Sequence, residues 1–195
     1  MKIATILMGL VAVTTSLPAA TILFGGGGSL GSSHVFGPVT ATGYLSNGTT
    51  GTLFGKGSAS TGSEDGLGLT ADPTGDNEIF PGTDFIQLSG VSLLTGSIFI
   101  SMGSTGGDTW AVYGTNTAGS LAGATLLASG GDDDAVEVSV PNALNYLYLD
   151  IKATTNNVLL QDLVYTSSVP EPGTLGIVGL GGVLIGVMRR RLKQS

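Results

Sequence analysis

The sequence predicts an all-β protein whose body is an antiparallel β-sandwich of the jelly-roll type. Two observations predict it. Between residues 21 and 168, apolar and polar side chains alternate in short runs, which is the period of a half-buried strand. These runs are separated by turn-forming segments such as SNGTTG, GSTGGD and SGGDDD. The long charge-free apolar runs lie instead near the two ends of the chain, so we divide it into residues 1–20, 21–168 and 169–195.

Residues 1–20 have the pattern of a secretory signal peptide. Lys2 precedes an apolar run over residues 3–13, and the segment ends in Leu17-Pro18-Ala19-Ala20. A positive start, an apolar helix and a small-residue exit are what the Sec export machinery and its peptidase recognise. We expect cleavage after Ala19 or Ala20. The alternative is a buried N-terminal helix.

The strands expected in the body follow one another from residue 98 to residue 165. Residues 98–102 place alternate apolar side chains on one face, and residues 109–116, 135–141 and 157–165 form similar runs. The run YLYLDIKA predicts that Leu147, Leu149 and Ile151 point inward, and that Tyr146, Tyr148 and Asp150 point outward. The glycine-rich stretch at residues 25–31 matches a phosphate-loop spacing, but no helix pattern follows it. We therefore expect a flexible segment there.

Charge is distributed unevenly along the chain. Residues 21–168 hold two lysines and thirteen acids, a net charge of −11, although the whole chain carries −7. Such a body is repelled by phosphate backbones, so the sequence predicts no nucleic-acid partner. The chain has no cysteine, which excludes disulfides and thiolate metal sites.

The C-terminal segment combines three features in a fixed order. Val169-Pro170-Glu171-Pro172 is an extended linker, residues 173–188 are sixteen residues without a charge, and the basic cluster Arg189, Arg190 and Arg191 follows. As a helix the apolar run reaches about 24 Å, near the lower limit for a single transmembrane helix. Arginines stay on the cytoplasmic side, so both ends of the chain predict a body outside the cytoplasm.

This order resembles the PEP-CTERM sorting signal of bacteria. The resemblance implies that the protein is an exosortase substrate, which is exported, held in the membrane by the C-terminal helix, processed near the motif, and then released or moved to the cell surface. It also implies an association with exopolysaccharide and biofilm matrix. The alternative is a permanent membrane anchor. The body, mainly over residues 108–165, resembles galactose-binding-like and discoidin-type sandwiches.

Two groups of residues in the body are candidate binding sites. Calcium takes carboxylate and amide oxygens from loops, and it is the cofactor that the sequence offers. Its candidate ligands are Glu64, Asp65, Asp76, Asn77 and Glu78, for which the alternative is a solvated turn. Aromatic platforms for carbohydrate are Trp110, Tyr146 and Tyr148, although Trp110 on an alternating strand also fits a core position.

These features predict an exported, non-enzymatic surface or matrix protein with a structural or adhesive role, glycosylated on its many Ser and Thr residues. The alternative is a lectin-like module that binds polysaccharide with the help of calcium. A secreted hydrolase is the third reading. If such a hydrolase used a Ser-His-Asp triad, its histidine would have to be His34, the one histidine of the chain.

Overall fold

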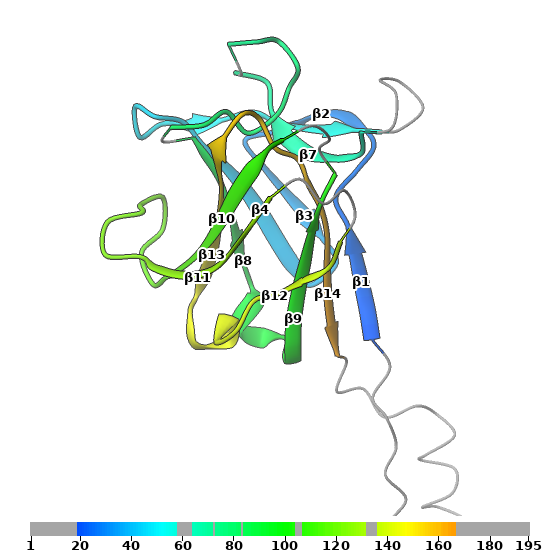
Figure 1. Cartoon of the computed structure of the whole chain (residues 1–195), viewed down its shortest axis with the longest axis vertical. Coiled ribbons are helices and arrows are strands. Elements are labelled where there is room, and N and C mark those ends of the chain that lie inside the picture. The colour runs from blue at the N-terminus through cyan, green and yellow to red at the C-terminus, as the bar shows by residue number, and fades with distance from the viewer. Residues whose placement is uncertain are drawn as a thin grey trace, which may run out of the picture. The chain divides into compact units, whose positions relative to one another are not determined.

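The structure, a computed structural model, describes residues 19–57, 64–71, 73–82, 84–103, 107–131 and 136–166. One compact unit spans Ala19–Ser168. Its described residues form two antiparallel sheets packed face to face, which confirms the predicted all-β sandwich (Figure 1).

The first sheet has seven strands among the described residues. β14 is central in it, because β9 pairs along one edge while β7 and β1 share the other edge. The order is β12 (Val138–Ser139), β9 (Thr95–Met102), β14 (Leu160–Thr166), β7 (Gly66–Leu69), β6 (Leu53–Lys56) and β2 (Gly28–Gly31), with β1 (Ala19–Leu23) beside β14.

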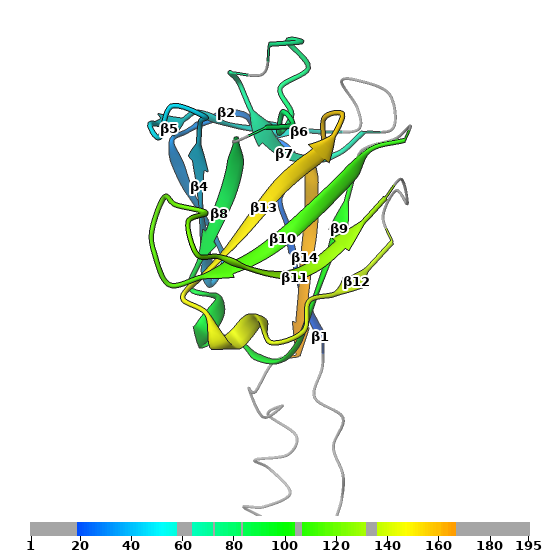
Figure 2. The ribbon, with the colours of Figure 1, turned by 60° about the vertical axis from the view of Figure 1, so that its left-hand side comes forward.

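The second sheet also has seven strands among the described residues, and it lies in front in Figure 2. Its order is β11 (Thr125–Gly130), β10 (Thr109–Thr115), β13 (Tyr148–Thr155), β8 (Phe85–Ser89), β4 (Val39–Tyr44) and β3 (Ser33–Phe36), with β5 (Thr50–Gly51) beside β4. The chain crosses between the sheets after β2, β5, β7, β8, β9, β11, β12 and β13, and such repeated crossing is typical of jelly-roll sandwiches. Two short 3₁₀ turns, η1 (Val91–Leu93) and η2 (Ala143–Asn145), lie on these crossings.

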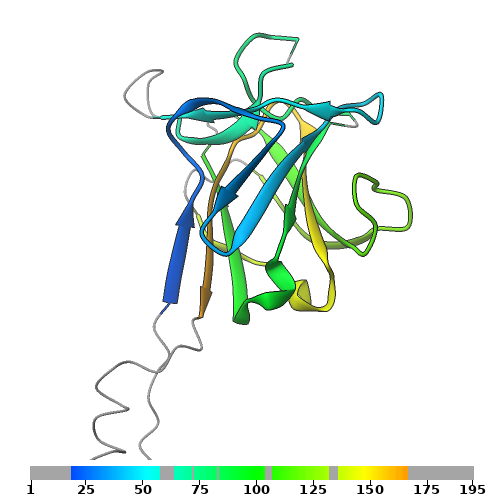
Figure 3. The same ribbon diagram turned by 180° about the vertical axis from the view of Figure 1, so that it is seen from behind.

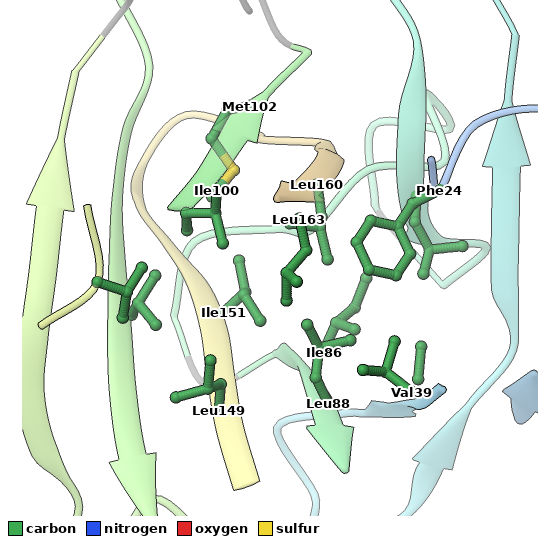
Figure 4. Packing of buried hydrophobic residues seen from close by; sticks show 14 of the residues in the cluster. Phe24, Val39, Ile86, Leu88, Ile100, Met102, Leu149, Ile151, Leu160 and Leu163 are labelled. Atoms are coloured by element: carbon green, nitrogen blue, oxygen red, sulfur yellow. The ribbon is translucent and has the colours of Figure 1, made fainter. Parts of the chain in front are cut away.

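The core lies between the inner faces of the sheets (Figure 4). Ile100 and Leu163 are directly opposed in the first sheet, and Ile86 and Ile151 in the second; all four are fully buried. Alternation along residues 98–102 brings Ile98, Ile100 and Met102 into this core, as the sequence predicted. Burying a side chain of this size contributes about 1.5–3 kcal/mol to the stability of the fold. The core and the side chains packed against it come from the whole body, from Ile22 to Tyr165. The body therefore has a complete core of its own.

Two positions near the start of β13 differ from a simple alternation of inward and exposed side chains, and the predicted direction is wrong at one of them, Leu147. Leu147 is 52% exposed instead of inward, because η2 turns the chain just before it and β13 begins only at Tyr148. Asp150 does point away from the core, but it is 0% exposed, because the connection after β10 covers it.

The glycine-rich stretch is also different from the prediction. Part of it is β2, which pairs with β6, so residues 28–31 are ordered into the sheet edge instead of forming a flexible segment. The approach is close, since a Cβ on Gly55 would collide with the carbonyl oxygen of Gly26. Gly26 itself has φ of 80°, a left-handed conformation that glycine adopts without strain. The phosphate-loop reading is excluded, because strand β3 follows instead of a helix.

Candidate functional site

Most of the described acidic side chains gather at one end of the sandwich, which we call the acidic end and define by Glu64, Asp76, Glu78, Asp84 and Asp108. The end of β6, the starts of β7, β8 and β10, and the connection from β7 to β8 meet there (Figure 1). Reciprocal backbone hydrogen bonds between Ile79 and Val158, of 2.8 and 3.1 Å, hold that connection against the sheet. Ile79 is fully buried and fixes the loop in the core.

Lys56 is the centre of an ion-pair cluster at the acidic end. Its Nζ donates a hydrogen bond of 2.6 Å to Glu64 and another of 2.6 Å to Glu78. The side chains of Lys56 and Glu78 are 6% and 7% exposed, while that of Glu64 is 25% exposed. A buried carboxylate needs such a partner, because an unpaired charge away from water is strongly destabilising.

The environment of this cluster shifts two pKa values. Burial raises the pKa of Glu78 to about 7, although the hydrogen bond and positive charge of Lys56 oppose the shift. Burial alone lowers the pKa of Lys56, but its hydrogen bonds to Glu64 and Glu78 outweigh this and leave that pKa above its ordinary value. The lysine therefore stays charged throughout the physiological range.

This geometry gives the calcium prediction no support. A lysine ammonium lies where Glu64 and Glu78 converge, so these two residues already bind a cation that the protein itself supplies. Among the described residues there is no group of three or more His, Cys, Asp or Glu side chains placed to hold a metal ion. Asp65 is separate from the cluster and packs against Gly25 and Gly103, and Asn77 bonds to the carbonyl of Gly75. Sequence reasoning missed Lys56, because it lies at the end of β6, while Glu64 and Glu78 lie on the connections before and after β7.

An open cleft of about 670 Å³ lies beside the cluster. Its walls combine carboxylates with amides and one aromatic ring, contributed by Asp76, Glu78, Asp108, Asn156, Asn157 and Phe80. Asp76 and Asn156 are exposed, and the amide of Asn157 donates to Thr74 at 2.9 Å. Such a lining offers hydrogen-bond donors and acceptors to a hydroxyl-rich ligand beside an apolar ring.

The three aromatic residues predicted as sugar platforms are placed differently. Trp110 is 3% exposed and belongs to the core, so its ring is not available for stacking on a ligand. Tyr146 follows η2, and its ring packs over Gly114, where a Cβ would collide with it. Tyr148 lies on β13 opposite Ser89 and is partly exposed. The structure does not bring these rings together with the cleft at the acidic end.

A second buried polar group lies on the outer face of the second sheet. The Oδ1 atom of Asp150 accepts a hydrogen bond of 2.7 Å from Gln87, whose side-chain oxygen accepts from the backbone of Gly119 at 3.0 Å. The other oxygen of Asp150 has no hydrogen-bond partner among the described residues. Burial raises the pKa of Asp150 to about 7, although the bond from Gln87 lowers it.

Both ends of the body leave the sandwich at the end opposite the acidic residues (Figure 3). Ala19 is paired with Thr166 and Ala20 with Tyr165, so the two predicted signal-cleavage positions are the first residues of β1. Thr95 and Thr166 bond reciprocally, with Oγ1 to carbonyl distances of 2.7 and 3.1 Å. The last described residue is therefore fixed to the start of β9.

The sorting residues predicted from the sequence, Val169–Pro172 and Arg189–Arg191, lie outside the described residues, as does the apolar run 173–188. Comparison with protein families identifies the motif in this segment. The PEP-CTERM protein-sorting motif matches residues 168–191.

The chain carries a PEP-CTERM sorting motif. No curated protein matches the chain. The PEP-CTERM motif makes the protein an exported substrate of exosortase that is anchored transiently in the membrane at its C-terminus before it reaches the surface. No helix in the described part of the chain has the length and apolar character needed to cross a membrane.

Proposed function

We propose that the body is a non-enzymatic structural or adhesive component of the extracellular matrix, and that the cleft at the acidic end contacts exopolysaccharide. The observation that carries this proposal is the lining of the cleft, where the exposed side chains of Asp76 and Asn156 lie beside the partly exposed ring of Phe80. The residues that line the cleft come from the β7–β8 and β13–β14 connections and from the start of β10, at the end of the sandwich opposite the end of β14 (Figure 1), so a sorted protein keeps the cleft accessible. We propose that surface Ser and Thr residues carry glycans.

The absence of catalysis is part of the proposal. The ring of His34 lies on β3 against the ring of Phe36, with 4.7 Å between their centroids, in a hairpin that does not line the cleft. The carboxylates of Glu64 and Glu78 are bonded to one ammonium. A hydrolase instead needs one carboxylate as an acid and the other as a base or nucleophile. These placements favour binding over hydrolysis.

The test is retention of the purified protein on exopolysaccharide from its own host. The double variant Asp76→Asn with Phe80→Ala should bind about tenfold more weakly, because it loses a charged acceptor and an apolar contact. Val35→Ser, at a position that is 64% exposed on β3, is the matched control and should bind like the wild type.

Three outcomes distinguish the hypotheses. Equal retention of the wild type and the double variant contradicts the proposal for the cleft. Loss of binding in a chelator supports the calcium-assisted alternative instead. Shortening of the polysaccharide chains during incubation contradicts the non-enzymatic role.

A further inference from the structure

The end of the sandwich at which β14 ends carries no charged side chain in the connections that form it. We call it the uncharged end and define it by residues 36–38, 90–94 and 140–147, which connect β3 to β4, β8 to β9 and β12 to β13. None of these residues is an acid, a lysine, an arginine or a histidine, so none is charged at neutral pH. In Figures 1 and 2, η1 and η2 lie at the end of the sandwich where β1 begins and β14 ends. The pairing of Ala19 with Thr166 and of Thr166 with Thr95 places the same strand ends together.

Two large apolar side chains project from the uncharged end. Leu93 on η1 is 80% exposed, and Leu147 after η2 is 52% exposed. Between β9 and η2 lies a cleft of about 260 Å³ whose lining also contains no ionisable side chain. Exposing two leucine side chains to water on an uncharged surface is unfavourable, so this surface favours an apolar contact.

The acidic residues lie far from this end. β9 runs from Thr95 at the uncharged end to Met102, which is seven residue steps and a rise of about 23 Å. That distance is more than two Debye lengths at physiological ionic strength, so charges at the acidic end are screened from anything that touches the uncharged end. Three further described acids, Asp65, Glu137 and Asp162, lie toward the Met102 end of β9. Asp150 lies near the start of β13 but is fully buried.

The length of the connecting chain limits what covers the uncharged end. Residues 167–172 are the six residues between the last described strand and the apolar run that begins at Gly173. Fully extended, they span at most about 20–22 Å. The hydrocarbon core is flanked on each side by a polar layer of about 5–8 Å. An inserted tail therefore keeps Thr166 within about 15 Å of the lipid headgroups.

We propose that the uncharged end rests on the bilayer surface while the sorting tail is inserted, with Leu93 and Leu147 in the headgroup layer and the acidic cleft directed away. The proposal rests on insertion of the tail. An anionic membrane repels the acidic end and accepts the uncharged end, so the net charge of the body orients it. Tethering supplies a high effective concentration, so a weak contact is sufficient. The contact also holds the processing motif beside the membrane, where exosortase acts.

The test measures depth with a fluorophore, since the chain has no cysteine and single cysteines can be placed at will. The mature chain with its tail is reconstituted in phosphatidylcholine–phosphatidylglycerol vesicles that contain a brominated lipid. A probe on Leu147→Cys should be quenched at least about threefold more than one on Ala71→Cys, an exposed position at the acidic end. Adding Leu93→Asp should roughly halve the quenching at residue 147, because the charge opposes insertion. Ala71→Asp is the matched control and should leave it unchanged.

A probe on Leu180→Cys, within the apolar run, reports insertion of the tail separately. Strong quenching at residue 180 with equal quenching at residues 147 and 71 overturns the proposal and leaves the tail insertion intact. No quenching at residue 180 refutes the insertion itself, and the proposal falls with it.

Discussion

Replacement of Asp150 by Asn tests how the buried carboxyl affects stability. In the folded protein Asp150 is 0% exposed, and its Oδ1 accepts a hydrogen bond of 2.7 Å from Gln87. Asparagine has nearly the same shape and keeps that acceptor, but it never ionises. The variant therefore removes the charge with little change in packing.

The magnitude follows from the two pKa values of the carboxyl. Burial raises the pKa of Asp150 from 3.8 to about 7. Between these values the unfolded chain is ionised while the folded protein holds a proton, so the wild type loses stability as the pH rises from about 4 to 7. Between pH 5 and pH 8 this carboxyl costs the wild type about 2–3 kcal/mol that the variant does not lose. The variant should thus gain that amount relative to the wild type over the interval.

The assay is urea unfolding of the body at pH 5 and pH 8. Trp110, the one tryptophan of the chain, is 3% exposed and reports loss of the core by fluorescence. Asp76→Asn, at an exposed carboxyl, is the control and should give the same pH dependence as the wild type. If the free energies of unfolding of Asp150→Asn and wild type change in parallel with pH, the reasoning about the buried carboxyl is wrong.

Three further predictions concern the ion-pair cluster, a close backbone contact and the ends of the chain. Lys56→Met should destabilise the body at pH 8 by about 3 kcal/mol, and by less at pH 5, where protonated Glu78 no longer needs a partner; equal losses in urea unfolding at both pH values contradict this. Gly68→Ala should cost at least about 2 kcal/mol, since its Cβ would collide with the backbone of Asn77. Gly57→Ala, whose Cβ finds its nearest neighbour at 3.6 Å, should be tolerated, and similar thermal midpoints for both variants would refute the contact. Intact mass of the protein from the host surface should lack both ends, with a new C-terminus near Pro170; a C-terminus at Ser195 contradicts processing.

Local alternation predicted the strands wherever the backbone stays regular. Ile98, Ile100 and Met102 entered the core because β9 keeps an unbroken two-residue period over them. The same rule was wrong for Leu147, because η2 interrupts the chain and shifts the start of the strand. It placed Asp150 on the outer face, where the structure has it, but alternation gives the face of a residue and not what covers that face.

The candidate sites show a similar division. The sequence correctly found that acids concentrate in residues 64–84, but it took Glu64 and Glu78 for ligands of an external cation. Their partner Lys56 lies at the end of β6, and the pairing of β6 with β7, together with the bonds between Ile79 and Val158, brings both carboxylates to its ammonium. Likewise Trp110 was a candidate platform by residue type, and its neighbours in the core decided its burial.

The sequence by itself determined the sorting tail and the fold class. A sorting motif is recognised from the order of its residues along the chain, so the sequence alone identifies it. The fold class follows from a period of two residues, which is a local property of strands. The tertiary structure alone decided that Lys56 bonds to two glutamates, that Asp150 is buried, and that β14 ends at the uncharged end, opposite the acidic cleft. Each of these depends on residues far apart in the chain, whose proximity is set by strand order and by packing of the two sheets.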